Sequence, residues 1–153
     1  MPAWSIVALD ERHIDGILAI EKESFRQPWQ RISFSTELSC RDAMNRVVLH
    51  PAHGQIIAYA CLRLNLDELH LLRIAVALGW RRQGIADRLL NSCFREARIR
   101  GASAVYLEVR QSNTFAKDLY KKLGFQIMAT RPKYFMDTGE DALIMIKVLE
   151  ETQ

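Results

Sequence analysis

The sequence predicts a mixed α/β fold in which one sheet of about seven strands is covered by about four helices. The first half of the chain alternates apolar runs with turn-forming residues, as antiparallel strands do. The second half runs strand, helix, strand, helix and strand, so the fourth and fifth strands must be parallel if they are neighbours in the sheet. The 153 residues, of which 49% are hydrophobic and 25% charged, suit a single domain spanning 1–153.

The first half of the chain predicts three strands and two helices. Residues 4–9 form a strand, and Asp10 can cap a helix that ends near Ser24, because Pro28 disfavours its continuation. The next elements are a short helix over about 33–39 and an antiparallel hairpin made by 47–49 and 55–64, with the turn-rich sequence HPAHG between its strands.

The strand expected over residues 69–76 carries an irregularity. Its apolar side chains fall first at odd and then at even positions, namely Leu69 and Leu71, then Leu72, Ile74 and Val76. A change of parity inside one strand is the signature of a β-bulge. We therefore expect a bulge at Leu72 or Arg73.

The remaining elements alternate between helix and strand. A long amphipathic helix begins at Gly84 and stops at Gly101, and a strand over 104–109 follows it. Ser112 is expected to cap a second helix, which Gly124 ends. The closing strands are expected near residues 125–130 and 141–149.

The strongest chemical signal lies where the bulged strand meets the long helix. The segment consists of Arg81, Arg82, Gln83, Gly84, Ile85 and Ala86. A helix start offers unpaired N–H groups to an anion, small residues let a phosphate approach, and arginines add charge. The segment therefore predicts a pyrophosphate site, although a tight turn with solvated arginines is the plainer alternative. The spacing matches neither a P-loop nor a dinucleotide fingerprint.

With this segment the sequence resembles the GNAT acetyltransferases, whose signature Q/R-x-x-G-x-G/A is matched by Arg81, Gly84 and Ala86. More narrowly it resembles the RimI group, whose members acetylate the N-terminal alanine of a small-subunit ribosomal protein. That resemblance is carried by residues 24–29, 73–76, 107–125 and 131–145. It implies the GNAT acyl-CoA N-acyltransferase fold, acetyl-CoA as co-substrate and the N-terminus of a protein or peptide as acceptor, in particular that of a ribosomal protein.

The resemblance also implies roles for individual residues. The backbone of Ile74, Ala75 and Val76 would pair with the pantetheine arm, the 81–86 loop would hold the pyrophosphate, and Asn113 would bind coenzyme A. Glu108 would be the general base and Tyr120 the general acid.

Elementary chemistry is consistent with these roles. An α-amine has a pKa of about 7.7 to 8.0, so a modest base such as Glu108 suffices, and we expect partial burial to raise the pKa of its carboxyl. Glu68 and His70, just before the bulge, are the alternative base.

On the acceptor side, Phe25, Pro28, Trp29 and Tyr134 are expected to form a partly apolar wall that grips the first residues of a peptide. The alternative is that these side chains merely anchor their loops onto the core. RimI targets have basic N-termini, so an acidic recognition patch must be local; its candidates are Asp67, Glu68, Glu140 and Asp141.

Composition argues against several other classes of protein. The net charge of +3 is spread along the chain, which disfavours a nucleic-acid groove, and no apolar run is long enough to cross a membrane. The three cysteines have no metal-ligand spacing, and His50 and His53 fit an exposed turn, so no metal is expected. We expect a cytoplasmic monomer or weak homodimer. Acetylation of a lysine or a small amine, and a non-catalytic acetyl-CoA sensor, stay open as alternatives.

Overall fold

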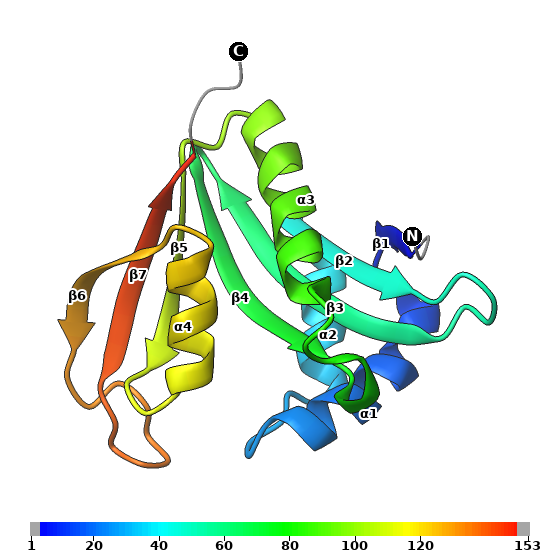
Figure 1. Cartoon of the computed structure of the whole chain (residues 1–153), viewed down its shortest axis with the longest axis horizontal. Helices are drawn as coiled ribbons and strands as arrows, with labels where there is room; N and C mark the ends of the chain where they lie inside the picture. The colour runs from blue at the N-terminus through cyan, green and yellow to red at the C-terminus, as the bar shows by residue number, and fades with distance from the viewer. Residues whose placement is uncertain (1–3, 150–153) are drawn as a thin grey trace.

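The computed structural model describes residues 4–149, which form one seven-stranded sheet with four α-helices, as predicted (Figure 1). The strands are β1 (Ser5–Ala8), β2 (Ala43–Leu49), β3 (Ile56–Asn65), β4 (Glu68–Val76), β5 (Ala104–Arg110), β6 (Gln126–Arg131) and β7 (Ala142–Val148). The helices are α1 (Ile14–Ser24), α2 (Arg31–Ser39), α3 (Ile85–Ile99) and α4 (Thr114–Lys122), with 3-10 turns η1 (Glu11–His13) and η2 (Leu78–Trp80).

The sheet divides between β4 and β5. The strand order is β1-β2-β3-β4-β5-β7-β6, and β4–β5 is the parallel pair among otherwise antiparallel neighbours. This ladder runs from Glu68↔Ala104 to His70↔Tyr106 and then stops, although β4 continues to Val76 alongside β3. Beyond His70 the two strands separate, as Figure 1 shows, and their facing edges are left without a ladder between them. We call this opening the splay.

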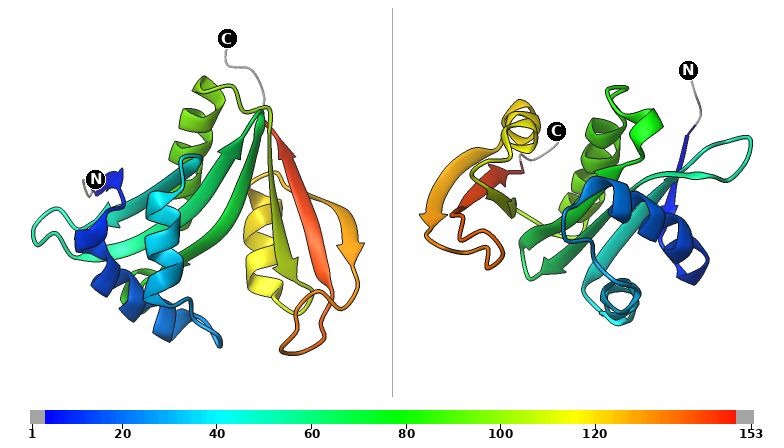
Figure 2. Two further views of the ribbon diagram at one scale, coloured as in Figure 1. Left: turned by 180° about the vertical axis from the view of Figure 1, so that it is seen from behind. Right: turned by 90° about the horizontal axis from the view of Figure 1, so that it is seen from below.

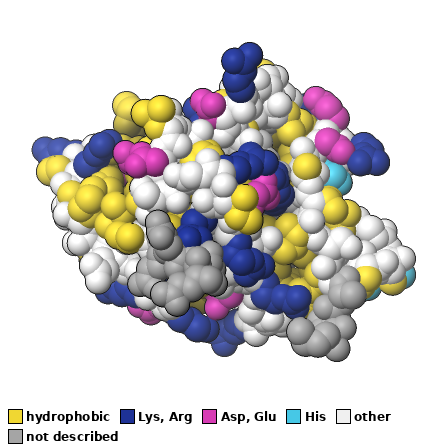
Figure 3. Space-filling view, turned by 90° about the horizontal axis from the view of Figure 1, so that it is seen from above, with side chains coloured by type: hydrophobic (Ala, Val, Ile, Leu, Met, Phe, Trp, Pro, Cys, Tyr) yellow, Lys and Arg dark blue, Asp and Glu magenta, His cyan; other side chains and the backbone are white. Residues whose placement is uncertain are grey.

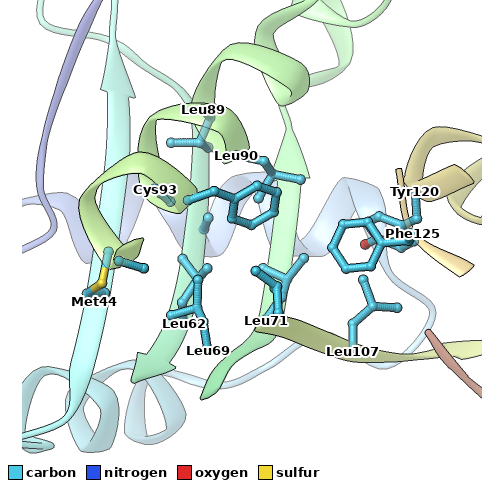
Figure 4. Close-up of a cluster of buried hydrophobic side chains, with 14 of the residues drawn as sticks. Met44, Leu62, Leu69, Leu71, Leu89, Leu90, Cys93, Leu107, Tyr120 and Phe125 are labelled. Carbon is cyan, nitrogen blue, oxygen red and sulfur yellow. The ribbon is translucent and has the colours of Figure 1, made fainter. Parts of the chain in front are cut away.

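Helices cover both faces of the sheet, α3 and α4 on one face and α1 and α2 on the other (Figure 2). The larger core lies on the α3 side, where apolar residues of β3, β4 and β5 meet α3 and α4 (Figure 4). The smaller core joins α1 and α2 to β2, β3 and β4. Within residues 4–149, no helix combines the length and apolar character that a bilayer span requires.

The predicted bulge in β4 is confirmed. The register between β3 and β4 passes from Cys61↔Arg73 to Leu62↔Leu71, so Leu72 is the extra residue. Apolar side chains at odd positions before the bulge, and at even positions after it, pack in the same core beneath α3. The bulge also turns Arg73 towards α1, where its guanidinium pairs with Glu21.

Two local predictions were wrong. Asn113 rather than Ser112 caps α4, and its side chain accepts a hydrogen bond from the N–H of Ala116 at 3.0 Å. The strand β2 begins at Ala43, earlier than the expected 47–49. Polar residues at its centre hide the strand from a hydrophobicity pattern, yet they are partnered: the Arg46 Nε donates to Glu96 at 3.2 Å.

Candidate active site

The start of α3 exposes backbone N–H groups that the helix does not use. Gly84 is its N-cap residue, with φ of +76°, a left-handed conformation that glycine adopts without strain. The first hydrogen bond of the helix runs from the N–H of Arg88 to the carbonyl of Gly84 at 3.1 Å, so the preceding N–H groups have no partner in the helix. A Cβ atom placed on Gly84 would meet nothing within 4 Å. These N–H groups are therefore open to a ligand.

The two arginines of this loop differ in their contacts. The Arg81 guanidinium donates to the carbonyl of Val76 at 2.9 Å and to the Ser24 hydroxyl at 3.0 Å, so it ties the loop to the ends of β4 and α1. Arg82 is exposed, and within residues 4–149 its side chain has no hydrogen-bond or ion-pair partner. The expectation that both arginines are free for phosphate therefore suits Arg82 better than Arg81.

The edge of β4 leads from the splay to this loop. Ile74, Ala75 and Val76 pair with β3 on one side, but the ladder to β5 has already ended. Their backbone groups on the β5 side are thus available to a linear ligand that carries amide groups. η2 then connects the end of β4 to the anion-binding loop.

Glu108 lies on the polar face of β5, opposite the α3 side, as the predicted alternation requires. His70 of β4 lies across from it, with 2.7 Å between the His70 Nε2 and the Glu108 Oε2. The imidazole also stacks on the Tyr106 ring, with 4.3 Å between ring centroids and 11° between planes. The structure therefore brings together Glu108 and His70, which the sequence analysis treated as alternatives.

The expected direction of the Glu108 pKa was wrong. The hydrogen bond from His70 lowers the pKa of this carboxyl below its usual value, and it outweighs the opposing effect of partial burial. The charge of Arg131 on β6 acts in the same direction. Glu108 is therefore ionised across the neutral range.

Tyr120 belongs to the core beneath α4. It is 8% exposed, and its ring lies 5.6 Å from that of Phe125 between centroids. Burial raises the pKa of its phenol to about 12, so the hydroxyl stays protonated. The phenol finds no hydrogen-bond partner among the described residues. Tyr120 and Glu108 lie on opposite faces of β5 and do not touch, so they could act together only on a group placed in the splay.

The side chain of Asn113 is partly occupied. Its Oδ1 serves the α4 cap, which leaves the Nδ2 amide as the group that can donate to a ligand. Asn113 caps α4, the helix that carries Tyr120, so the cap positions the Asn113 side chain at the start of the helix on which Tyr120 lies.

A buried charge pair that sequence reasoning missed supports the loop after α1. The Glu21 carboxylate is fully buried and accepts from the Arg73 Nη2 at 2.9 Å, from the Trp29 N–H at 2.7 Å and from the Tyr59 hydroxyl. The Arg73 guanidinium carbon lies 3.6 Å from the centroid of the Phe25 ring. The sequence did hold a signal for this pair: Glu21 lies seven positions after Ile14 and so falls on the apolar face of the same helix, where a charged residue needs a buried partner.

The four predicted acceptor residues separate into two groups. Phe25 and Trp29 pack against the smaller core beneath Arg73, which fits the anchoring alternative. Pro28 is exposed on the same loop, and Tyr134 is 42% exposed on the loop between β6 and β7. Of the four, Pro28 and Tyr134 are therefore the ones whose side chains the core does not occupy.

The four candidates for an acidic patch, Asp67, Glu68, Glu140 and Asp141, do not lie together. Glu68 lies opposite Ala104 at the start of β5, whereas Asp141 directly precedes Ala142, which is paired with Arg110 at its end. Six residues of strand, about 20 Å, separate these positions. Glu140 is also engaged locally, because it accepts from the Ser112 N–H at 3.1 Å. The face seen in Figure 3, which is the end of the molecule away from the start of β7, shows acidic and basic side chains interspersed.

Two of the three free cysteines are buried, and the third, Cys40, is partly exposed. Cys61 and Cys93 are buried, as expected, and burial raises the pKa of both thiols, that of Cys93 to about 12. Both are therefore protonated and poor nucleophiles. Between residues 4 and 149 no three His, Cys, Asp or Glu residues gather as a metal site would need.

Two parallel strands that separate, one of which leads into a helix start with open N–H groups, form the architecture of an acyl-CoA-dependent transferase. The model of the acetyltransferase (GNAT) family matches residues 14–125, and the chain belongs to this family.

Curated relatives give a narrower similarity. The chain is 34% identical over 143 residues to the [ribosomal protein bS18]-alanine N-acetyltransferase of Haemophilus ducreyi, covering 92% of this chain and 97% of that protein. The crystal structure of the ribosomal-protein-S18-alanine N-acetyltransferase from Escherichia coli superposes with a TM-score of 0.87 at 30% identity, covering 98% of this chain and 96% of that one. This chain thus resembles the RimI type within the family.

A more distant structure shows the same fold with the co-substrate bound. Arabidopsis thaliana NAA60 in complex with acetyl-CoA superposes with a TM-score of 0.85 at 16% identity, covering 96% of this chain and 99% of that one.

Proposed function

We propose that this enzyme transfers the acetyl group of acetyl-CoA to the α-amine of a protein N-terminus, specifically the N-terminal alanine of ribosomal protein bS18. The observation that carries the proposal is the placement of Glu108 beside the splay between β4 and β5, on a chain that also has an open anion site at α3. The choice of acceptor is supported by the relatives, which are named for that activity and align over most of this chain.

The residues present fit acetyl-CoA. The N–H groups at Gly84, Ile85 and Ala86, together with Arg82 and Gln83, would hold the diphosphate at the positive end of the α3 dipole. The free edge of Ile74, Ala75 and Val76 would pair with the pantetheine amides, and the Asn113 Nδ2 would donate to the same molecule. When bound, acetyl-CoA supplies an acetyl group activated as a thioester.

The chemistry assigned to the chain is proton transfer and charge stabilisation. Glu108, ionised at neutral pH, would accept the proton that the amine nitrogen loses as its bond to the acetyl carbon forms. The bulge at Leu72 leaves backbone N–H groups outside the ladder, and these would donate to the acetyl oxygen as negative charge develops on it. Tyr120, protonated because its pKa is raised, would give its proton to the departing sulfur.

The proposal is tested with an Ala-first peptide that carries the bS18 N-terminus, incubated with acetyl-CoA and the enzyme. We expect one acetyl group on the α-amine, located by tandem mass spectrometry, and equal release of free thiol. The control peptide has a blocked N-terminus and keeps its lysines. Acetylation of the control at the same rate would make this a lysine acetyltransferase, and cofactor binding without transfer to either peptide would leave the small-amine and sensor alternatives.

A further inference from the structure

His70 lies where the two halves of the sheet part, and its contacts are those of a positioned group. It belongs to the last β4–β5 ladder pair, so its backbone is fixed by β3 on one side and β5 on the other. Its ring is held flat on Tyr106, and its Nε2 is directed at the Glu108 carboxylate. The His70 and Glu108 side chains are 23% and 16% exposed, so water competes little for this hydrogen bond.

We infer that His70 is a positioning residue for the general base: its Nε2–H orients the Glu108 carboxylate towards the splay. This inference rests on the proposed function. An ionised carboxylate can only accept, so the proton between the two groups belongs to the His70 Nε2. One carboxylate oxygen, Oε2, is then engaged, and Oε1 is left to face the amine. His70 acts through Glu108 and need not touch the substrate.

Few other charged groups act on this pair. The charge of Arg131 on β6 lowers the pKa of the Glu108 carboxyl. The charges of Glu108 and of Glu68 on β4 add to the effect of burial, which raises the pKa of the Tyr106 phenol. Arg63 of β3 stands opposite His70 in the ladder, but its guanidinium is engaged by Glu37 of α2, with the Nε at 3.1 Å. The hydrogen bond from His70 has the largest effect on the pKa of the Glu108 carboxyl, which it lowers. Partial burial has the next largest effect and raises this pKa.

Removing the His70 donor should therefore shift the pKa of Glu108 in a defined direction, upwards. In the wild type the pKa of Glu108 is lowered, so the base stays active as the pH falls. Without His70, burial remains and raises this pKa, so Glu108 becomes protonated at a higher pH. The acid limb of the kcat profile then moves towards neutral pH. His70→Gln keeps an N–H donor near the position of Nε2, whereas His70→Leu has similar size and no donor.

The experiment measures kcat against pH, at saturating peptide and acetyl-CoA, for the wild type, His70→Gln and His70→Leu, with His53→Gln as a histidine control in an exposed turn. We expect His70→Leu to lose about tenfold at pH 5.5 and little at pH 8, with His70→Gln close to the wild type. Superimposed profiles for His70→Leu and the wild type would overturn the inference. So would loss at every pH in both variants to the level of Glu108→Gln, which would make His70 itself the base.

A second measurement does not depend on turnover. Carbon-13 NMR of the Glu108 carboxyl is titrated in the wild type and in His70→Leu, with assignment by Glu108→Gln. We expect the midpoint to rise in His70→Leu, and an unchanged midpoint would refute the inference. If the midpoint rises while the wild type acetylates no peptide, the pairing stands and the proposed acceptor fails.

Discussion

The two arms of the sheet on either side of the splay are built differently. In the first arm, made of β1 to β4 with α1 to α3, six consecutive residues of β3 are buried, Ile57–Leu62, and buried carboxylates are paired with arginines. In the second arm, made of β5 to β7 with α4, every residue of β6 is exposed. A ladder of three residue pairs joins the arms. Under the proposed function, the first arm carries most of the groups that would bind acetyl-CoA, while the second carries Asn113 and the groups assigned to proton transfer.

The comparison of the two arms predicts the largest loss of stability when the buried pair of Glu21 and Arg73 in the first arm is broken. Glu21→Gln or Arg73→Ala leaves an uncompensated buried charge, and we expect a loss of about 3–5 kcal/mol in the free energy of unfolding, measured by urea denaturation. The matched change in the second arm, Asp137→Asn opposite Arg110, should cost clearly less. Equal losses in both arms would contradict the comparison.

Acetyl-CoA binding should depend on the start of α3 in the first arm, and a single negative charge introduced there should weaken it. Gly84→Asp places a carboxylate against the diphosphate, and we expect acetyl-CoA affinity measured by calorimetry to fall about 10³-fold, because like charges at an interface cost several kcal/mol. Gly84→Asn has the same shape and the same backbone requirement at φ of +76°. It should lose much less, and equal losses would mean that backbone strain, not charge, is responsible.

Turnover, in contrast, should depend on the second arm without loss of binding. Glu108→Gln and Tyr120→Phe are each expected to lower kcat by about 10²-fold and to leave the acetyl-CoA Kd near that of the wild type. Stopped assays of thiol release, paired with calorimetry, measure both quantities. Wild-type turnover in either variant would remove that residue from the mechanism.

The smallest effect concerns the cap of α4. Asn113→Ala should lower stability by about 0.5–2 kcal/mol, since the Oδ1 bond to the Ala116 N–H is lost. Ser112→Ala is the control, because the side chain of Asn113, and not that of Ser112, accepts the capping bond from α4. A larger loss from Ser112→Ala than from Asn113→Ala would reverse the assignment of the cap.

The order of strands and helices, the β4 bulge and the helix start at Gly84 were all predictable. Each follows from residues that are close in the sequence: the elements from the spacing of apolar residues, the bulge from a change of parity within one strand, and the helix start from the glycine that precedes it. The start of β2 was missed because Asn45 and Arg46 interrupt its apolar pattern, and both side chains donate to distant groups, the Asn45 Nδ2 to the Glu37 carbonyl and Arg46 to Glu96. Local patterns do not report partners that lie far along the chain.

The sequence by itself determined the fold class, the family and the helix start that suits a diphosphate, since these follow from short-range spacing. Only the tertiary structure decided that His70 and Glu108, 38 residues apart, share a hydrogen bond, and that Glu21 and Arg73 form a buried pair. The direction of the Glu108 pKa depends on that contact. A pKa is set by the charges and donors within a few ångströms in space, and sequence spacing does not specify which residues those are.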